Sequence, residues 1–418
     1  MKQLLFIVVL CSYLSGISQS KEVYLKQNRF DLNSETFNFP QKDFNIIGFG
    51  AYHGSAKTED VELKLLQSLT KDGTIKYYLP ETDFSVAHYY NEFMKTGDTL
   101  LLKDLVIQNG MHVRQERTIE VYEKWKTLKC LNDKLPKPNR IKILGADVVS
   151  NYKYSSKHIL KLIDESFKTE VLSELREMVK IDTTSYARGE LSYAHGVLDR
   201  LIKDYEVNTS AYNTKIKDLK VFRHIIDGIK NSMAKKQREP SIYDNYLFLK
   251  EHYNFENQKP FMRIGFWHLE KSREGKNANP PFFTKLIENE IYPKDKVISV
   301  IGYFTESEVV WNELYDDNGN YTGYTIEGGF GIGDYEKEYF RGIQNLKNTK
   351  LSDKTLFRLN SSNTPYSNNE PDLIDIIMTD EKSNSEAVKG MPTIDFLDYA
   401  ILISNSKAST PIYELDHL

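Results

Sequence analysis

The sequence predicts an α/β fold, with a mostly parallel central sheet flanked by helices and a large all-helical insertion. Two observations lead to this fold class. Short apolar runs that read as strands alternate with helical patterns over residues 21–155 and again over 259–418. Between them, residues 156–258 carry long 3.6-residue periodicity with almost no strand signal. A chain of 418 residues is long enough for one large domain with such an insertion.

The first twenty residues predict a secretory signal peptide, residues 1–20. A short positive start is followed by an apolar run, Leu4–Leu14, and by a small-x-small cleavage site, Ser18–Ser20. The apolar run is too short to span a membrane. Leu10 stands before Cys11, where a lipoprotein signal has a small residue. We therefore expect an exported protein, periplasmic or secreted, without a lipid anchor.

Charge and cysteine content exclude several classes of protein. The 55 basic and 59 acidic residues nearly balance, and no basic block suggests a nucleic-acid partner or a polybasic membrane surface. Aromatic residues make up 12% of the chain, which suits a large core and a pocket with aromatic walls for a small-molecule substrate. Removal of the signal leaves Cys130 as the single cysteine, so we expect no internal disulfide and no cysteine-based zinc site. Its helical pattern predicts a small core residue.

The first half of the chain reads as a series of strands and helices. An apolar run from Asn45 breaks into a glycine-rich turn, and further apolar runs predict strands at Ile75–Leu79 and Arg140–Asp147. Apolar residues at helical spacing predict the helices between and after them, at Val61–Leu69, Val86–Met94, Thr99–Ile107 and Thr118–Leu131.

The second half begins with the helical insertion and returns to strands. Helical stretches are predicted at Lys157–Ile163, Leu172–Val179, Val197–Tyr205 and Ile216–Ala234. Strands are predicted at Pro260–Trp267, Val297–Phe304, Lys354–Asn360 and Phe396–Ser404, with a helix at Pro280–Glu290. Asp317-Asn-Gly319 suits a type I′ turn within a hairpin over 306–325. The glycine-rich segment 328–333 lacks the strand and helix of a dinucleotide site, so we expect a loop there.

Three predicted strands end in residues that can move protons. His53 follows the first strand, Glu81 the second, and His268 the strand at Pro260–Trp267. In right-handed βαβ units the strands run the same way, so these side chains emerge at the same edge of the sheet, where ligand crevices form. A histidine beside a carboxylate can run proton-transfer chemistry near neutral pH. The alternative is a chain reversal in which His53 is hydrogen-bonded and idle.

Glu116 and Asp147 are further candidates with simpler alternatives. Glu116 precedes a helix, where a negative charge is favourable without any function. Asp147 ends the third strand and either orients a histidine, binds substrate or caps the next helix. The sequence contains neither the His-Glu-x-x-His zinc motif nor the Gly-x-Ser-x-Gly nucleophile elbow.

The order of these motifs resembles the erythromycin esterase-like family. Gly50-Ala-Tyr-His-Gly54 and Glu81-Thr-Asp83 are similar to the ends of the family's first two strands. The likeness continues, in order, through Arg114–Glu116, Ile119–Leu131, Ile143–Asp147, Ile264–His268, Val297–Phe304 and Asp395–Ile412. The resemblance implies an α/β fold with a helical insertion. It also implies ester hydrolysis by a histidine general base that activates water, with no required metal or other cofactor.

The resemblance carries roles to particular residues of this chain. It makes His53 the base, Glu81 the acidic residue after the second strand, Glu116 the helix glutamate and His268 the first histidine of a pair. Three positions depart from the family. Gly50 stands where the family has a glutamate, Lys271 falls on the second histidine, and Lys64 falls on an arginine, which keeps charge without the bidentate fork.

The sequence thus predicts an exported hydrolase of an ester or related acyl bond. His53, Glu81, His268 and Glu116 are the expected catalytic residues, and Lys64, Lys271, Asp147 and Arg114 the expected substrate-binding residues. One alternative is a metal-dependent hydrolase with His53, Glu81 and His268 as ligands, a set that zinc accepts. The other is a non-catalytic protein that keeps the pocket to bind a small molecule or a glycan.

Overall fold

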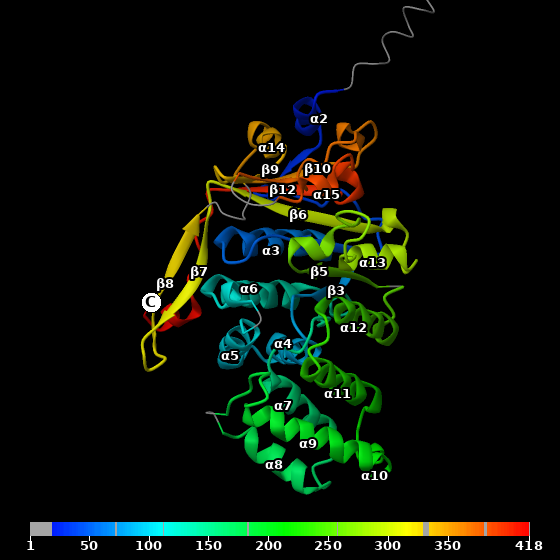
Figure 1. Cartoon of the computed structure of the whole chain (residues 1–418), viewed down its shortest axis with the longest axis vertical. Helices are drawn as coiled ribbons and strands as arrows, with labels where there is room; N and C mark the ends of the chain where they lie inside the picture. Colours follow the sequence, from blue (N-terminus) through cyan, green and yellow to red (C-terminus); the bar gives the residue numbers. More distant parts are fainter. Residues whose placement is uncertain are drawn as a thin grey trace, which may run out of the picture.

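The computed structural model describes residues 19–71, 73–111, 113–181, 184–256, 258–328, 334–379 and 383–417. Residues 1–18 of the predicted signal peptide, and 329–333 of the predicted glycine-rich loop, lie outside the described residues. The molecule is elongated, with α14 and β10 toward one end of its long axis and α8–α10 at the other (Figure 1).

An eight-stranded sheet forms the centre of the fold. Its spatial order is β1 (Arg29–Asp31), β10 (Lys354–Arg358), β12 (Tyr399–Ser404), β6 (Val297–Thr305), β2 (Ile46–Gly50), β5 (Lys259–Arg263), β3 (Ile75–Leu79) and β4 (Lys142–Ile143). The strands from β12 to β4 are parallel to one another, whereas β10 runs antiparallel to β1 and β12. This arrangement confirms the predicted α/β class with a mostly parallel sheet.

Helices cover both faces of the sheet, which explains the apolar character of its strands. Ile47 and Phe49 belong to one apolar core with residues of α3 (Ala56–Thr70), α4 (Phe84–Thr96), α5 (Thr99–Asn109) and α6 (Ile119–Lys134). Ile46 packs on the opposite face, against α12 (Arg238–Tyr253) and α13 (Phe282–Glu288). Farther along that face, α2 (Lys21–Gln27) and α14 (Ile343–Thr349) cover β12 and β10.

The middle of the chain forms a helical layer beyond α4 and α5 (Figure 1). It comprises α7 (Tyr152–Leu162), α8 (Glu170–Met178), α9 (Tyr193–Val207), α10 (Thr209–Asn213) and α11 (Leu219–Met233). These helices share an apolar core that includes Ile159, Leu172, Leu198 and Phe222. The next helix, α12, returns to the sheet and buries Ile242, Tyr246 and Leu249 against it. Among the described residues no helix is both long and apolar enough to cross a bilayer.

The predicted hairpin is present, but its turn differs from the prediction. Strands β7 (Glu308–Tyr315) and β8 (Tyr321–Gly328) pair antiparallel and extend along one side of the molecule (Figure 1). Only Gly319 has a positive φ there, +80°, whereas a type I′ turn needs two such residues. The Asp316 side chain closes the turn instead by accepting from the backbone N–H groups of Asn318 and Asn320, at 2.9 and 2.8 Å.

Two other sequence expectations are corrected. Cys130 is exposed, because it lies off the buried stripe of α6 that contains Val121, Trp125 and Leu128. Strand β5 ends at Arg263, short of the predicted Trp267, and Phe266–Leu269 forms a short 3₁₀ helix, η4. The chain leaves the sheet at Gly265, whose N–H donates to the Glu81 carboxylate at 3.1 Å.

Candidate active site

Three of the predicted catalytic side chains meet at the carboxyl edge of the sheet. His53 lies in the turn after β2, Glu81 follows β3, and Glu116 ends a short 3₁₀ helix, η2 (Arg114–Glu116). The Nδ1 atom of His53 lies 2.9 Å from Glu116 Oε1, and its Nε2 atom lies 3.4 Å from Glu81 Oε2. The His53 side chain is 17% exposed and both carboxylates are buried. The His53 side chain is therefore partly accessible to solvent, while both of its ring nitrogens face carboxylates.

Local structure fixes the two strand-end residues. Gly54 adopts φ +81°, a conformation that glycine takes without strain. Its carbonyl accepts the backbone N–H groups of Val310 and Ser409, each at 2.9 Å, which anchors the turn beside His53. Two residues after Glu81, the Asp83 side chain caps α4 by accepting from the N–H groups of Ser85 and Val86. Both turns thus hold their functional side chains on rigid structure.

Arg238 is the central residue that the sequence did not single out. It is the first residue of α12, and its guanidinium donates to the Glu81 carboxylate and, at 3.0 and 2.6 Å, to both oxygens of Asp147. Its Nη1 atom lies 3.2 Å from Nε2 of His268, and Nδ1 of His268 contacts Glu239. Because Nε2 faces an N–H donor, it is an acceptor there, and His268 directs Nδ1–H to Glu239. Arg238 therefore connects His268 and Asp147 to the His53 cluster.

The charges around His53 change its proton affinity. Burial lowers the pKa of His53, but the negative charges and hydrogen bonds of Glu116 and Glu81 outweigh burial and raise that pKa to about 9. Burial raises the pKa of Glu81, but His53 and then Arg238 act more strongly and hold it below its usual range. The pKa of Glu116 is lowered in the same way, because His53 outweighs burial. At neutral pH the site holds an imidazolium between two carboxylates.

A second ionic group lies buried next to Glu116. The Lys124 ammonium lies 2.5 Å from Glu59 and 3.0 Å from Glu62, and the fully buried Arg263 guanidinium lies 3.6 Å from Glu62. Lys124 and Arg263 both favour the ionised form of Glu116 and so lower its pKa. Glu116 therefore stays ionised and can accept a hydrogen bond from His53. The sequence offered no signal for this group, because the partners come from α3, α6 and β5.

Gly50, the position where the resemblance predicts a glutamate, has no room for a side chain. A Cβ atom on Gly50 would lie 2.5 Å from the Cα atom of Phe266 and 3.0 Å from the carbonyl of Ile264. Backbone cannot move aside as a flexible side chain can, so η4 packs on β2 only because position 50 has no side chain. The same close approach brings η4, with His268, toward the end of β2.

The remaining predicted residues lie in different surroundings. Asp147 binds Arg238 and does not cap α7, whose first turn is capped by Asn151. Lys271 is buried and paired with both oxygens of Asp398, each at 2.9 Å, so its charge is used inside the fold. Arg114 is exposed on η2, two residues before the buried Glu116.

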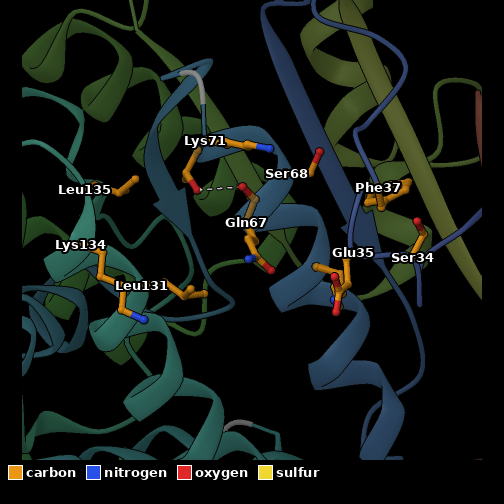
Figure 2. Close-up of a pocket in the computed structure, with 11 residues that line it drawn as sticks. Ser34, Glu35, Phe37, Gln67, Ser68, Lys71, Leu131, Lys134 and Leu135 are labelled. Carbon is orange, nitrogen blue, oxygen red and sulfur yellow. Dashed lines mark hydrogen bonds between the residues drawn. The ribbon is translucent and has the colours of Figure 1, made fainter.

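The structure does not bring Lys64 to the cluster. Lys64 lies on α3 and lines a separate cavity of about 260 Å³. Figure 2 shows this cavity, formed by residues near Glu35 and by the last turns of α3 and α6. The first residue of α3 lies at the site edge of the sheet, and a rise of about 1.5 Å per residue carries Lys64 roughly 12 Å along the helix away from it.

A metal ion would find a different ligand set from the predicted one. Among the described residues, His53, Glu81 and Glu116 form the group whose possible ligand atoms all lie within 4.8 Å of one another. His268 is not part of it, since its Nε2 atom faces the Arg238 guanidinium. One imidazole and two carboxylates are ligands that zinc accepts. Arg238, bound to Glu81, works against a further cation at that carboxylate.

Comparison with solved structures shows the same fold at low sequence identity. A protein from Bacillus cereus is 14% identical over 94% of this chain and 98% of its own, with a TM-score of 0.62. A succinoglycan biosynthesis protein is 13% identical, with the same coverage and a TM-score of 0.54. A mutant of the erythromycin esterase EreC, in its open conformation, is 11% identical over 88% of this chain and 92% of its own, with a TM-score of 0.56.

No protein-family model and no curated protein sequence matches the chain. The likeness to the erythromycin esterase that the motif order predicts is therefore confirmed at the level of the fold.

Proposed function

We propose that this protein hydrolyses an ester or a related acyl bond, with His53 as the general base that activates water. The observation that carries the proposal is the position of His53, at the carboxyl edge of the sheet, with Nδ1 held by Glu116 at 2.9 Å and with the side chain 17% exposed to solvent. A base must be oriented and must reach water, and His53 meets both requirements. The fold shared with an erythromycin esterase adds support.

The proposed reaction needs the neutral form of His53. In that form Nδ1–H donates to Glu116, and Nε2 presents its lone pair on the side of Glu81. A water hydrogen-bonded to Nε2 gives it a proton as the water oxygen bonds to the acyl carbon. Collapse of the tetrahedral intermediate breaks the bond to the leaving oxygen, which takes the proton back from His53. Arg238, whose guanidinium contacts Glu81 and is held by Nε2 of His268, then supplies the donor for the oxyanion.

The proposal predicts a basic pH optimum. Because the pKa of His53 is raised to about 9, roughly one molecule in a hundred has the base form near pH 7. We expect log kcat/KM to rise with unit slope and to level off above about pH 9. Initial rates on the best substrate of a panel of esters and lactones, measured across pH, test this. A bell centred near neutrality, or a rate that falls as His53 deprotonates, would contradict the role of base.

The substitution Glu116→Gln is expected to shift this pH–rate profile. The amide keeps the shape of the side chain and removes the charge that contributes most to the raised pKa of His53. We expect the rising limb of the profile to move toward neutral pH, with a lower plateau because the orienting carboxylate is lost. An unchanged midpoint would show that another group controls the profile.

A metal-dependent hydrolase is the second candidate, favoured by the closeness of His53, Glu81 and Glu116. In that reaction the three side chains would hold an ion that lowers the pKa of its bound water. Metal analysis after purification without chelator separates the two candidates, since a stoichiometric ion on which activity depends would favour the metal site. Ligand binding without turnover of any ester would favour a non-catalytic binding protein.

We also propose that the protein is exported, on the strength of the sequence of residues 1–20. Comparison of the N-terminus of the protein isolated from cells with the predicted start at Lys21 tests this. An intact N-terminus on protein in the cytoplasmic fraction would argue against export.

A further inference from the structure

Glu239 is a carboxylate beside the site that the proposed reaction does not use. It is the second residue of α12 and directly follows Arg238. Its Oε1 atom contacts Nδ1 of His268, and the side chains of Glu239 and His268 are 14% and 12% exposed. Its Oε2 atom is buried and has no hydrogen-bond partner in the described part of the chain. The contact with His268 is therefore the hydrogen bond that this carboxylate makes there.

The simplest explanation of Glu239 is a favourable charge in the first turn of a helix. Glu170 of α8 occupies such a position, and it is exposed. Glu239 differs from Glu170, because it is largely covered and contacts an imidazole that belongs to η4. A helix charge alone requires no such contact.

The donors of Arg238 show what the contact controls. A guanidinium has five N–H groups. Nε and one N–H of Nη2 donate to Asp147, and the other N–H of Nη2 donates to Glu81. One N–H of Nη1 faces Nε2 of His268 at 3.2 Å. The second N–H of Nη1 has no partner among the described residues, so it can bind a substrate oxygen while all these contacts stay intact.

A small molecule can reach this guanidinium from a cavity. Arg238, Glu239 and His268 all line a cavity of about 290 Å³, and the Arg238 side chain is 31% exposed. The volume is near the lower end of the range for small-molecule pockets, which suits a small ester.

We propose that Glu239 is a positioning residue that fixes the tautomer of His268 and thereby the N–H that Arg238 offers to the oxyanion. Glu239 accepts the Nδ1–H of His268, so Nε2 keeps its lone pair and accepts one N–H of Nη1. In the other tautomer two donors would face each other, and the guanidinium would lose its fixed orientation. The inference rests on the proposed hydrolase function, because it assigns the oxyanion to Arg238.

The kinetic test compares two substitutions of Glu239. Glu239→Leu removes the acceptor and should lower kcat/KM on the best ester by about a hundredfold, mainly through kcat. Glu239→Gln should stay within about tenfold of wild type, because its amide oxygen can accept the same Nδ1–H. Glu170→Leu is the control, since it removes a first-turn carboxylate at the far end of the molecule (Figure 1). Equal losses in both Glu239 variants, or wild-type activity in Glu239→Leu, would overturn the inference.

The ¹⁵N NMR signals of the histidine side chains test the tautomer without any turnover. In the wild-type protein His268, identified by the signals that His268→Asn lacks, should show a protonated Nδ1 and an unprotonated Nε2. Glu239→Leu should lose this pattern, because it leaves a largely covered N–H without an acceptor, and Glu239→Gln should keep it.

The same spectra separate this inference from the proposed function. If the pattern and its loss in Glu239→Leu are seen and no ester is turned over, the role of Glu239 toward His268 stands and the hydrolase fails. If the wild-type protein has a protonated Nε2, or if Glu239→Leu keeps the pattern, the inference fails, whatever esters are hydrolysed.

Discussion

Replacing His53 with alanine is expected to lower kcat/KM on the best ester substrate by about a thousandfold. The reason is that no other side chain in the cluster can take its place. Glu116 and Glu81 are held ionised by charge partners, and their lowered pKa values make them weak bases. Arg238 is always protonated. The measurement is the initial rate at about pH 9, where the proposed base is half deprotonated in the wild-type protein.

Three controls accompany this measurement. Alanine leaves two buried carboxylates facing each other, so thermal unfolding of the variant must be recorded at the same pH. His53→Gln keeps an N–H donor for Glu116 but cannot accept a proton, and it should lose nearly as much activity as the alanine variant. His195→Ala, on α9 with its ring against the Arg188 carbonyl, is the matched histidine control. Activity of His53→Gln within about threefold of wild type would remove His53 from the mechanism.

The residues at strand ends could be predicted because topology decides where they go. Parallel strands bring their carboxyl ends to one edge, so the positions of His53 and Glu81 in the sequence already implied that they meet. The fold class followed in the same way from the alternation of strands and helices. Glu116 had two interpretations, because its location at a helix N-terminus also fits an idle charge. The structure shows that Glu116 is buried and lies 2.9 Å from His53.

The residues that escaped prediction depend on contacts far apart in the sequence. Arg238 reaches Glu81 from 157 positions away, at the start of a helix whose first residue gives no chemical signal. Lys271 was predicted to bind substrate, because the sequence gives no sign of its ion partner Asp398, which lies 127 positions later. Lys64 was predicted at the site from the family resemblance alone. In the structure it lies two turns along α3, away from the carboxyl edge of the sheet, and lines a separate cavity. The role of such a charged side chain depends on its neighbours in space, which the local sequence pattern does not show.

A row of aromatic rings joins α4 to the helical layer and to α12, and we expect it to make the fold sensitive to acid. The row consists of His88, His158, Phe84, His224, Phe248 and His252. The rings of His88 and His158 stack with centroids 3.9 Å apart, and those of His224 and Phe248 with centroids 3.8 Å apart. Such close ring contacts favour neutral imidazoles, since two stacked imidazoliums would repel.

The direction of the expected effect of pH on stability follows from the pKa values of the histidines in the row. Burial is the largest cause that lowers the pKa of His88 to about 4, of His158 to about 3 and of His224 to about 4. Lys161 lowers the first two further, and Glu92 opposes this at His88. In the unfolded chain these histidines titrate near 6.5, so between about pH 6.5 and pH 4 the unfolded state binds more protons. Stability therefore falls as the pH falls through this window.

The expected loss is large compared with the stability of a protein. For His224, a pKa of 6.5 in the unfolded chain and of about 4 in the fold correspond to roughly 3 kcal/mol as an upper bound. That is a substantial share of the stability of a typical domain, about 5 to 15 kcal/mol. We expect the midpoint of urea unfolding to drop steeply below about pH 6, and His224→Phe to remove about 2 kcal/mol of the difference in unfolding free energy between about pH 7 and pH 5.

Phe84→Leu is the control for the histidine variant, because it weakens the same row without removing a titratable group. It should lower stability equally at both pH values, and a pH slope in His224→Phe equal to that of wild type would contradict the prediction. The row also bears on the chemistry, since α12 carries Phe248 and His252 near one end and Arg238 at its start. Separation of α12 from α4 in acid would take the guanidinium away from Glu81. We therefore expect acid to lower turnover in two ways, by protonating His53 and by separating α12, which carries Arg238, from α4.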